Sequence, residues 1–419
     1  MSFQQGLSGL NASSKNLEVI GNNVANANTI GAKESRAEFA DMYASAINGT
    51  SIGIGVNLQA VTQQFTQGNI TTSDSPLDLA INGNGFFEVS NGSQTLYTRN
   101  GQFQADKDGF IANNAGLKLV GYPAAKDGTI QPGAAVPLQL PTGGVDPNPT
   151  SKVTIEMNLD ARKATTLASP VPTPQVDFSD ATTYNDATSV TVFDAKGQDV
   201  ALTYYFQKSA TDTWNVYATA NGTSVNVDGL GNPLPVTTIA FPPNGGTPTA
   251  PLGTVAMTIP STTNAAGATT LAIPGVALDV TGATQFGSTF GVTSMAQDGY
   301  TAGQLTSVSI EKSGIVMATY SNGQSKPAGQ LELATFRNPQ GLSPLGGNLW
   351  ARSYTSGDPT VGTPGTGNIG QLQAGALEES NTDLTGELVN MITAQRVYQA
   401  NAQTIKTQDQ VLQTLVNLR

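Results

Sequence analysis

Residues 381–419 read NTDLTGELVNMITAQRVYQANAQTIKTQDQVLQTLVNLR, a stretch without proline that decides the fold at this end of the chain. Apolar side chains recur in it at alternating spacings of four and three residues, interrupted by Gln395 and Asp409. That spacing places them along one side of an α-helix. The stretch therefore predicts a helix of roughly 35 residues, about 50 Å long, with Asn381 or Thr382 as its N-cap.

The opposite end of the chain carries a second pattern of this kind. Residues 2–27 contain no proline and repeat the same spacing, with Ser14 and Gly21 as small residues in the series. Packing on the chain's own core is the ordinary explanation, but a helix of about 50 Å is longer than a small β domain covers. We therefore favour an assembly interface in which the two helices pair with each other and with copies of themselves. Its expected residues are Phe3, Leu7, Leu10, Leu17, Val24, Leu384, Leu388, Met391, Tyr398, Ile405, Leu412 and Val416.

The region between the helices, about residues 70–370, has the pattern of β structure. Short runs of alternating apolar residues are separated by Asn-Gly and Asp-Gly pairs, such as Asn91-Gly92, Asp108-Gly109 and Asn322-Gly323. These pairs tolerate the positive φ angles of tight hairpin turns. The expected fold class is mixed and mainly β, with terminal α-helices forming a coiled-coil-like layer and two nested antiparallel β domains.

Proline-rich and glycine-rich segments near residues 150 and 297 divide the β region, and the part between them is an insertion. The expected domains are a terminal helical coiled-coil domain (1–27 and 381–419), a linker region (28–72 and 371–380), an inner β domain (73–150 and 298–370) and an outer inserted β domain (151–297). The linker shows few strand or helix signals beyond residues 37–46.

Composition excludes several classes of function. The 419 residues include no cysteine and no histidine, which removes disulfides, His- or Cys-bound zinc and Ser-His-Asp triads. With 19 basic and 30 acidic residues the net charge is −11, which argues against binding nucleic acid. Residues 229–278 carry no charge, but Gly, Pro, Thr and Asn interrupt them, so we expect no membrane insertion. The first residues lack the basic and apolar regions of a cleavable signal peptide.

The remaining candidate sites have simpler structural explanations. Asp106-Lys107-Asp108-Gly109 lacks the glutamate of a calcium loop and is typical of a hairpin turn. Glu378 and Glu379 precede a helix start, where acidic residues are favourable. Trp214 and Trp350 have the spacing of strand residues in a core. We expect no catalytic, cofactor-binding or metal residues, and therefore not an enzyme.

Several motifs resemble the axial rod and hook proteins of the bacterial flagellum, and most specifically the hook proteins. At the N-terminus they are residues 6–12 (GLSGLNA) and 22–33 (NNVANANTIGAK), and at the C-terminus 380–384 (SNTDL) and 391–402 (MITAQRVYQANA). In the middle they are 76–87 (PLDLAINGNGFF), 97–101 (YTRNG), 320–323 (YSNG) and 336–342 (FRNPQGL). The resemblance covers nearly the whole chain and is weakest over 215–295. It departs at Ala32, where the family usually carries an aromatic residue.

The resemblance implies a structural subunit that polymerises with itself into a curved tube, the universal joint that transmits motor torque from rod to filament. It implies contacts with the distal rod protein, the hook-filament junction protein and the hook cap protein. It also implies an extracellular location at the flagellar hook, reached by type III export without a cleavable signal. A distal rod protein is the near alternative, although such chains are typically shorter. A secreted β-rich adhesin is a second class of function, and a carboxylate-based glycan hydrolase a third.

Overall fold

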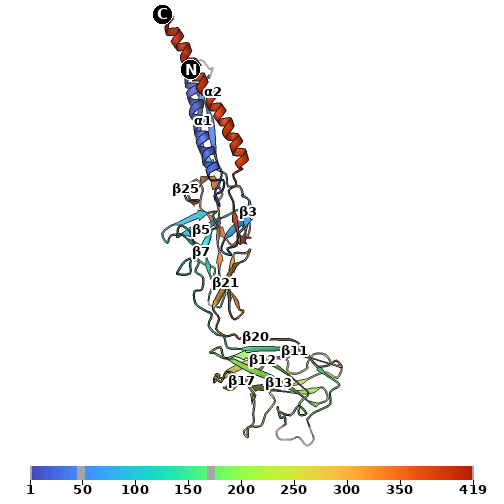
Figure 1. The fold of residues 1–419 in the computed structure, drawn as a ribbon. Coiled ribbons are helices and arrows are strands. Elements are labelled where there is room, and N and C mark those ends of the chain that lie inside the picture. Colours follow the sequence, from blue (N-terminus) through green and yellow to red (C-terminus); the bar gives the residue numbers. More distant parts are fainter. Residues whose placement is uncertain (1, 45–51, 126, 168–174, 418–419) are drawn as a thin grey trace. The chain divides into compact units, whose positions relative to one another are not determined.

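The computed structural model describes residues 2–44, 52–125, 127–167 and 175–417. The chain forms two compact units (Figure 1). Unit 1 comprises Met1–Thr142, Thr306–Thr319 and Ser325–Arg419, and unit 2 comprises Gly143–Leu305 and Tyr320–Gln324. Among the described residues, neither helix is both long and apolar enough to cross a membrane.

The helices lie at the two ends of the chain, as the sequence predicts. α1 (Ser2–Ala25) and α2 (Leu384–Asn417) run side by side in unit 1 (Figure 1). The predicted N-cap of α2 is wrong by one or two residues. The backbone N–H of Thr385 donates to Asp383 Oδ1 at 3.0 Å, because the side chain of Asn381 is bonded to the backbone of Glu34 and Gln64 instead.

A long antiparallel hairpin follows α1, in the segment that we expected to serve only as a link. Its strands are β1 (Ser35–Ala44) and β2 (Ile52–Gln63), and both contact α1. The half-buried side chains of Ile54, Val56 and Leu58 alternate along β2. This period of two is a strand signal present in the sequence. Gly53 and Gly55, which weaken a strand prediction, obscured it.

A thirteen-stranded sheet forms most of the β structure of unit 1. Along its main path the strands are β21 (Leu305–Ile310), β22 (Ile315–Tyr320), β23 (Ser325–Leu331), β9 (Lys118–Pro123), β5 (Phe86–Ser90), β6 (Thr95–Thr98), β26 (Leu349–Ala351) and β25 (Ser343–Gly346). Off this path lie β7 (Phe103–Ala105), β8 (Ile111–Asn113), β10 (Val136–Pro137), β24 (Leu333–Thr335) and β27 (Thr360–Gly362). One short 3₁₀ helix, η1 (Pro339–Gly341), precedes β25.

Two short strand pairs join distant parts of unit 1. β3 (Ile70–Thr72) pairs with β29 (Ala376–Glu378), and β4 (Leu79–Asn82) pairs with β28 (Gln371–Ala374). The segment 371–380, expected to be a linker, is therefore strand over most of its length. These pairs bring the segment that precedes α2 beside the segment that follows the hairpin.

Unit 2 consists of two five-stranded sheets around one core. The first contains β11 (Lys152–Asp160), β17 (Val255–Ile259), β18 (Ile273–Asp279), β19 (Thr284–Phe286) and β20 (Gly291–Gln297). The second contains β12 (Asp186–Phe193), β13 (Asp199–Ala210), β14 (Thr213–Ala220), β15 (Thr223–Ser224) and β16 (Thr237–Ala240). Side chains from both sheets share one buried cluster, which includes Trp214. Trp350 is likewise buried in unit 1, so both tryptophans are core residues as predicted.

The expected antiparallel pairing holds for most strand pairs but not for β11. This strand pairs in parallel with β18 and β19, and antiparallel with β20. β18 and β19 are more than a hundred residues further along the chain than β11, so no tight hairpin fixes their direction.

The predicted turns are confirmed where adjacent strands pair. Asn221 and Gly222, both with positive φ, connect β14 to β15, and Gly109 turns the chain between β7 and β8. In that second turn Asp106 Oδ1 accepts hydrogen bonds from the backbone N–H groups of Asp108 and Phe110. The motif at residues 106–109 is therefore a hairpin turn, as its sequence indicates.

The core of unit 1 contains a carboxyl group, that of Glu88 in β5, with only 6% of the residue exposed. Burial, and then the charge of Glu332, raises the pKa of Glu88 to about 7. In the unfolded chain the same carboxyl loses its proton near its ordinary pKa of 4.5. Between these two values the folded protein binds more protons than the unfolded chain, so the stability of unit 1 falls as pH rises.

We expect Glu88→Gln to remove this fall in stability. Relative to wild type, the variant gains up to about 3 kcal/mol of unfolding free energy between pH 4.5 and pH 8. Urea unfolding at both pH values measures the gain, with Glu311→Gln at an exposed position as the matched control. An unchanged pH dependence in Glu88→Gln contradicts the prediction.

Candidate assembly interface

Small residues let α1 and α2 approach closely. A Cβ atom added at Gly6 would lie 3.0 Å from Ile405 Cγ1, and one at Gly9 would lie 2.9 Å from Asn401 Nδ2. Ser13 continues this face of α1, buried and with its hydroxyl donating to the carbonyl of Gly9 at 2.8 Å. Glycines on this face of α1 therefore allow the close contact with α2, and, among the described residues of α1, Ile20 is the one large apolar side chain that is fully buried.

Ile405, a predicted interface residue, lies on this contact face, whereas the predicted residues of α1 lie beside it. Gly6, Ser13 and Ile20 are buried at a spacing of seven, one position before the predicted series at Leu7 and Ser14. One residue corresponds to a rotation of about 100° around a helix. None of the predicted residues whose side chains are described is fully buried in the subunit. Phe3, Leu7, Leu384, Leu388, Tyr398 and Leu412 are exposed, and Leu10, Leu17, Val24, Met391 and Ile405 are half-buried. The side chain of Val416 lies outside the described residues.

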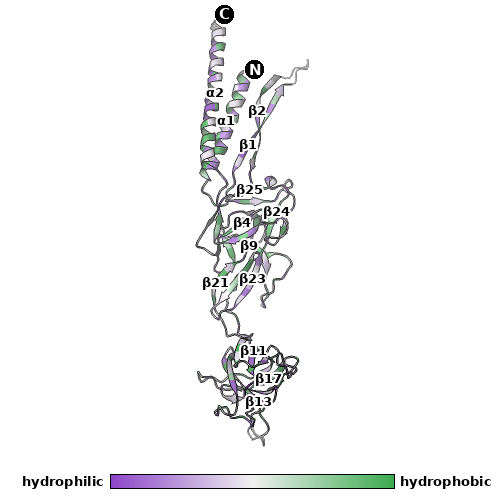
Figure 2. Cartoon of the chain, turned by 90° about the vertical axis from the view of Figure 1, so that its right-hand side faces the viewer, coloured by the Kyte–Doolittle hydropathy of each residue, from purple (hydrophilic) through white to green (hydrophobic). Residues whose placement is uncertain are grey.

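Further apolar side chains of α2 are exposed that the sequence analysis did not include. They are Val389, Ile392, Val397 and Val411, with between 47% and 58% of each residue accessible. Hydrophobic residues are spread along both helices (Figure 2). Monomeric soluble proteins seldom expose a large continuous apolar surface. We call the exposed apolar residues of α1 and α2 together the helix stripe.

Below the helices, three charged side chains form a buried ion triad. Lys33 Nζ lies 2.6 Å from Glu378 Oε1, and Arg99 Nη1 lies 2.9 Å from Glu378 Oε2. The side chains of Lys33 and Glu378 are fully buried, and that of Arg99 is 4% exposed. Burial lowers the pKa of both Lys33 and Arg99. A charge in such a place is tolerated only when it is paired and hydrogen-bonded.

The triad ties together segments from three parts of the sequence. Lys33 also donates to the carbonyl of Thr66, and Arg99 donates to the carbonyl of Gly83. Glu378 Oε1 accepts from the backbone N–H of Gly68, and its own carbonyl accepts from Gly31. The triad therefore fixes where the chain leaves α1 and where it approaches α2. Sequence analysis placed Glu378 among the acidic residues before a helix and missed this pairing, although all three residues lie in or beside the quoted motifs.

Ala32, where the sequence departs from the family motif, lies beside a cavity. Ala32 is 6% exposed and lines a cavity of about 200 Å³, whose wall also includes Asn26 and Trp350. A cavity therefore adjoins the position at which the resembling proteins carry an aromatic side chain. The hairpin and the triad nonetheless keep their hydrogen bonds next to it, such as the bond from Trp350 Nε1 to Gln63 Oε1 at 2.6 Å.

We expect Glu378→Gln to destabilise unit 1 by about 3–5 kcal/mol, because it leaves two buried cations without their carboxylate. Glu379→Gln is the matched control, since Glu379 is adjacent and only half-buried. Thermal and urea unfolding of both variants measure the difference. A loss of stability equal in the two variants contradicts a specific role for the triad.

Four family models match this chain, in segments that together cover most of its length. The Flagella basal body rod protein family matches residues 3–33, and the Flagellar hook protein FlgE/F/G D1 domain matches 80–165. The Flagellar basal body protein FlaE D2 domain matches 158–300, and the Flagellar basal body rod FlgEFG protein C-terminal family matches 373–418. Helix α1, the start of the β region, nearly all of unit 2 and helix α2 thus each fall within a match.

Individual relatives match over their full length. The flagellar hook proteins FlgE of Salmonella typhimurium and Escherichia coli are each 43% identical to this chain, and all of both chains is covered. That of Borreliella burgdorferi is 30% identical and covers all of this chain and 99% of its own. The crystal structure of Helicobacter pylori flagellar hook protein FlgE2 shares the fold, with a TM-score of 0.52, 16% identity, and coverage of 74% of this chain and all of that one. Because relatives at 43% identity match it from one end to the other, the chain belongs to the family of bacterial flagellar hook proteins.

Proposed function

We propose that the chain polymerises through α1 and α2 into a curved tube that acts as a universal joint and passes motor torque from rod to filament. Its relatives are flagellar hook proteins, so the chain is a structural subunit of the flagellar hook and not an enzyme. The observation that supports assembly through the helices is the helix stripe, which the folded subunit leaves exposed.

Burial of the helix stripe is the driving force that we propose. Removing apolar surface from water is worth about 25 cal/mol per Å². Several side chains the size of leucine, each about half exposed, therefore supply several kcal/mol per subunit when copies cover them. Because α1 and α2 already contact each other through Gly6 and Gly9, their larger side chains are free to contact neighbouring copies. Contacts between unlike surfaces that do not close into a ring produce a helical polymer.

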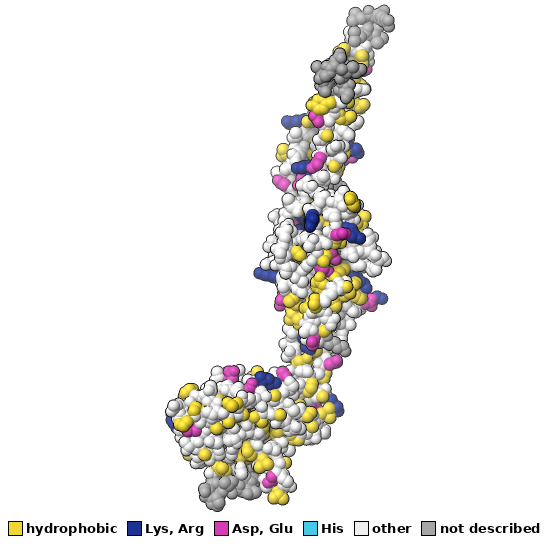
Figure 3. All heavy atoms as spheres, turned by 180° about the vertical axis from the view of Figure 1, so that it is seen from behind, with side chains coloured by type: hydrophobic (Ala, Val, Ile, Leu, Met, Phe, Trp, Pro, Cys, Tyr) yellow, Lys and Arg dark blue, Asp and Glu magenta, His cyan; other side chains and the backbone are white. Residues whose placement is uncertain are grey.

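The β structure is weakly charged. Only 12% of all residues are charged, and residues 243–272 of unit 2 contain no charge and many threonines. On the face drawn in Figure 3, charged side chains are scattered among uncharged atoms. Neighbouring copies that meet through such polar, hydrated faces exchange contacts at little cost, because water replaces each lost hydrogen bond. We propose that the helices form the rigid inner layer and that the β domains slide as the tube bends. The division into helical layer, linker, inner and outer β domains is part of this proposal.

The proposal extends to partners and location. The distal rod protein, the hook-filament junction protein and the hook cap protein are the expected neighbours at the two ends of the tube. Export through the flagellar type III pathway to the cell exterior fits a chain without cysteine, in which no disulfide obstructs passage of the unfolded polypeptide. The alternatives of a rod protein and an adhesin are not favoured, because the full-length relatives are named as hook proteins.

Introducing negative charge on the helix stripe tests assembly through the helices. The variant Leu388→Glu/Leu412→Glu places two carboxylates on surfaces that must lose water in a polymer, at residues that are 46% and 50% exposed in the subunit. We expect the number of hooks per cell to fall at least tenfold when this variant replaces the hook protein of a flagellated host. Electron microscopy of isolated hooks gives the count, and circular dichroism of the purified chain checks that its fold is unchanged.

The matched control is Leu230→Glu/Leu252→Glu in unit 2, at residues that are 89% and 88% exposed. It makes the same chemical change outside the helices, and we expect hook number to stay within twofold of wild type. Normal hooks from the helix variant, or equal loss in both variants, would contradict assembly driven by the helix stripe.

A further inference from the structure

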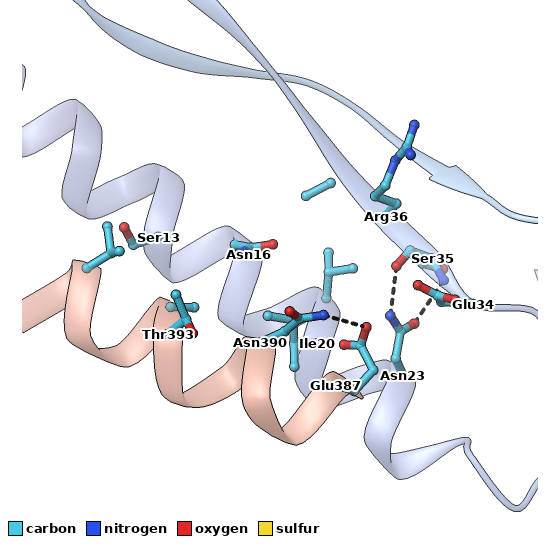
Figure 4. A pocket seen from close by; sticks show the side chains of 14 residues that line it. Ser13, Asn16, Ile20, Asn23, Glu34, Ser35, Arg36, Glu387, Asn390 and Thr393 are labelled. Carbon is cyan, nitrogen blue, oxygen red and sulfur yellow. Dashed lines mark hydrogen bonds between the residues drawn. The ribbon is translucent and has the colours of Figure 1, made fainter. Parts of the chain in front are cut away.

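A pocket lies between α1, α2 and the start of β1, all within unit 1 (Figure 4). Its volume is about 310 Å³, and polar side chains from all three elements line it. They include Asn16 and Asn23 from α1, Glu387 and Asn390 from α2, and Glu34 just before β1. We call it the acidic pocket.

Glu387 is incompletely paired in this pocket. The residue is 7% exposed, and its Oε1 accepts a long hydrogen bond of 3.4 Å from Asn390 Nδ2. Its Oε2 is buried and has no hydrogen-bond partner among the described residues. Figure 4 shows the Glu387 carboxyl between Asn390 and Asn23, and the amide of Asn23 is already occupied by two hydrogen bonds to the backbone of Ser35. A buried carboxylate oxygen without a donor is costly, so a donor from outside the subunit would be stabilising at this oxygen.

The charges around the pocket favour a cation as that donor. Burial, and then the charge of Glu387, raises the pKa of Glu34; the charge of Arg36 opposes this rise and that of Asp383 adds to it. Arg36 also lines the pocket, but its side chain is 64% exposed and its guanidinium pairs with Glu38 at 2.9 Å. No group of acidic residues among those described is arranged to hold a metal ion. A guanidinium instead offers five N–H donors to carboxylate and amide oxygens.

The helices carry one suitable guanidinium outside these pairs. Arg396 in α2 is exposed, and no salt bridge joins it to any described residue. It follows Glu387 by nine residues, which places it about 14 Å further along the helix and on the opposite side. Arg396 therefore points away from the pocket of its own subunit.

We infer that in the assembled hook Arg396 of a second copy enters the acidic pocket and pairs with Glu387 and Glu34. This inference rests on the proposed polymerisation through the helices. Because pocket and guanidinium lie on opposite sides of the same helix, each copy offers both halves of the contact to different neighbours. A contact of this kind repeats without closing on itself, as the growth of a tube requires.

The pairing is tested by exchanging the charges at residues 396 and 387. The host carries this chain as its only hook protein, and its hooks are isolated and counted. Arg396→Glu places a third carboxylate beside those of Glu387 and Glu34, and we expect the number of hooks to fall at least tenfold. The double variant Arg396→Glu/Glu387→Lys restores the pairing with reversed charges, and we expect at least half of the wild-type number. Lys406→Glu is the matched control, since Lys406 is an exposed cation on the same helix, and it should stay within twofold of wild type.

A proximity measurement separates this inference from the proposed function. The chain has no cysteine, so Asn390→Cys/Gln399→Cys introduces the only two thiols, one lining the pocket and one a turn away from Arg396, and keeps Glu387 and Arg396 in place. Their positions on opposite sides of α2 prevent a short thiol cross-linker from joining them within one subunit. We expect isolated hooks to yield a ladder of cross-linked multimers, whereas each single-cysteine variant yields none.

Hooks that form but give only monomers after cross-linking overturn the inference and leave the polymer intact, with solvent alone in the pocket. Normal hook numbers with Arg396→Glu likewise overturn it. Failure of the wild-type chain itself to form hooks contradicts the proposed function instead.

Discussion

The carboxylate of Glu378 holds the two ends of this chain in one place. It lies fully buried between Lys33, which follows α1, and Arg99, which comes from the loop after β6. A buried ion pair seldom adds much net stability, because desolvation cancels most of the attraction. Its value lies in specificity, since any other arrangement of these segments leaves a buried charge unpaired. The end of α1 and the start of α2 are therefore held side by side independently of any contact between the helices themselves.

Because their neighbouring ends are held in place, α1 and α2 need few contacts with each other to stay side by side. The two helices approach closely at Gly6 and Gly9 of α1, which lie against Ile405 and Asn401 of α2. The large side chains remain outside, which is costly for a monomer and favourable for a subunit that neighbours will cover. Glu387 is likewise unfavourable in the single chain, because one of its carboxylate oxygens is buried without a hydrogen-bond donor.

Motifs and periodicity predicted much of the architecture. Both helices, the hairpin turns at Asn221-Gly222 and Asp108-Gly109, and the buried tryptophans follow from local rules that depend on neighbours in the sequence. The hairpin of β1 and β2 could also have been predicted, since Ile54, Val56 and Leu58 alternate, but the glycines between them weakened the strand pattern. The parallel pairing of β11 could not be predicted from the sequence, because long connections place no local constraint on strand direction.

The sequence alone determined that the chain ends in two amphipathic helices around a β-rich middle, and which family its motifs resemble, because periodicity and motifs are properties of order along the chain. The tertiary structure decided which side of each helix faces inward. The buried position is Gly6 rather than Leu7, one residue away, and tertiary contacts of α1 such as the hydrogen bonds of Asn23 to Ser35 help to set that rotation. It also decided that Lys33, Arg99 and Glu378 meet, although hundreds of residues separate the first two from the third. Contacts over such distances depend on how strands pair and pack, which no local pattern specifies.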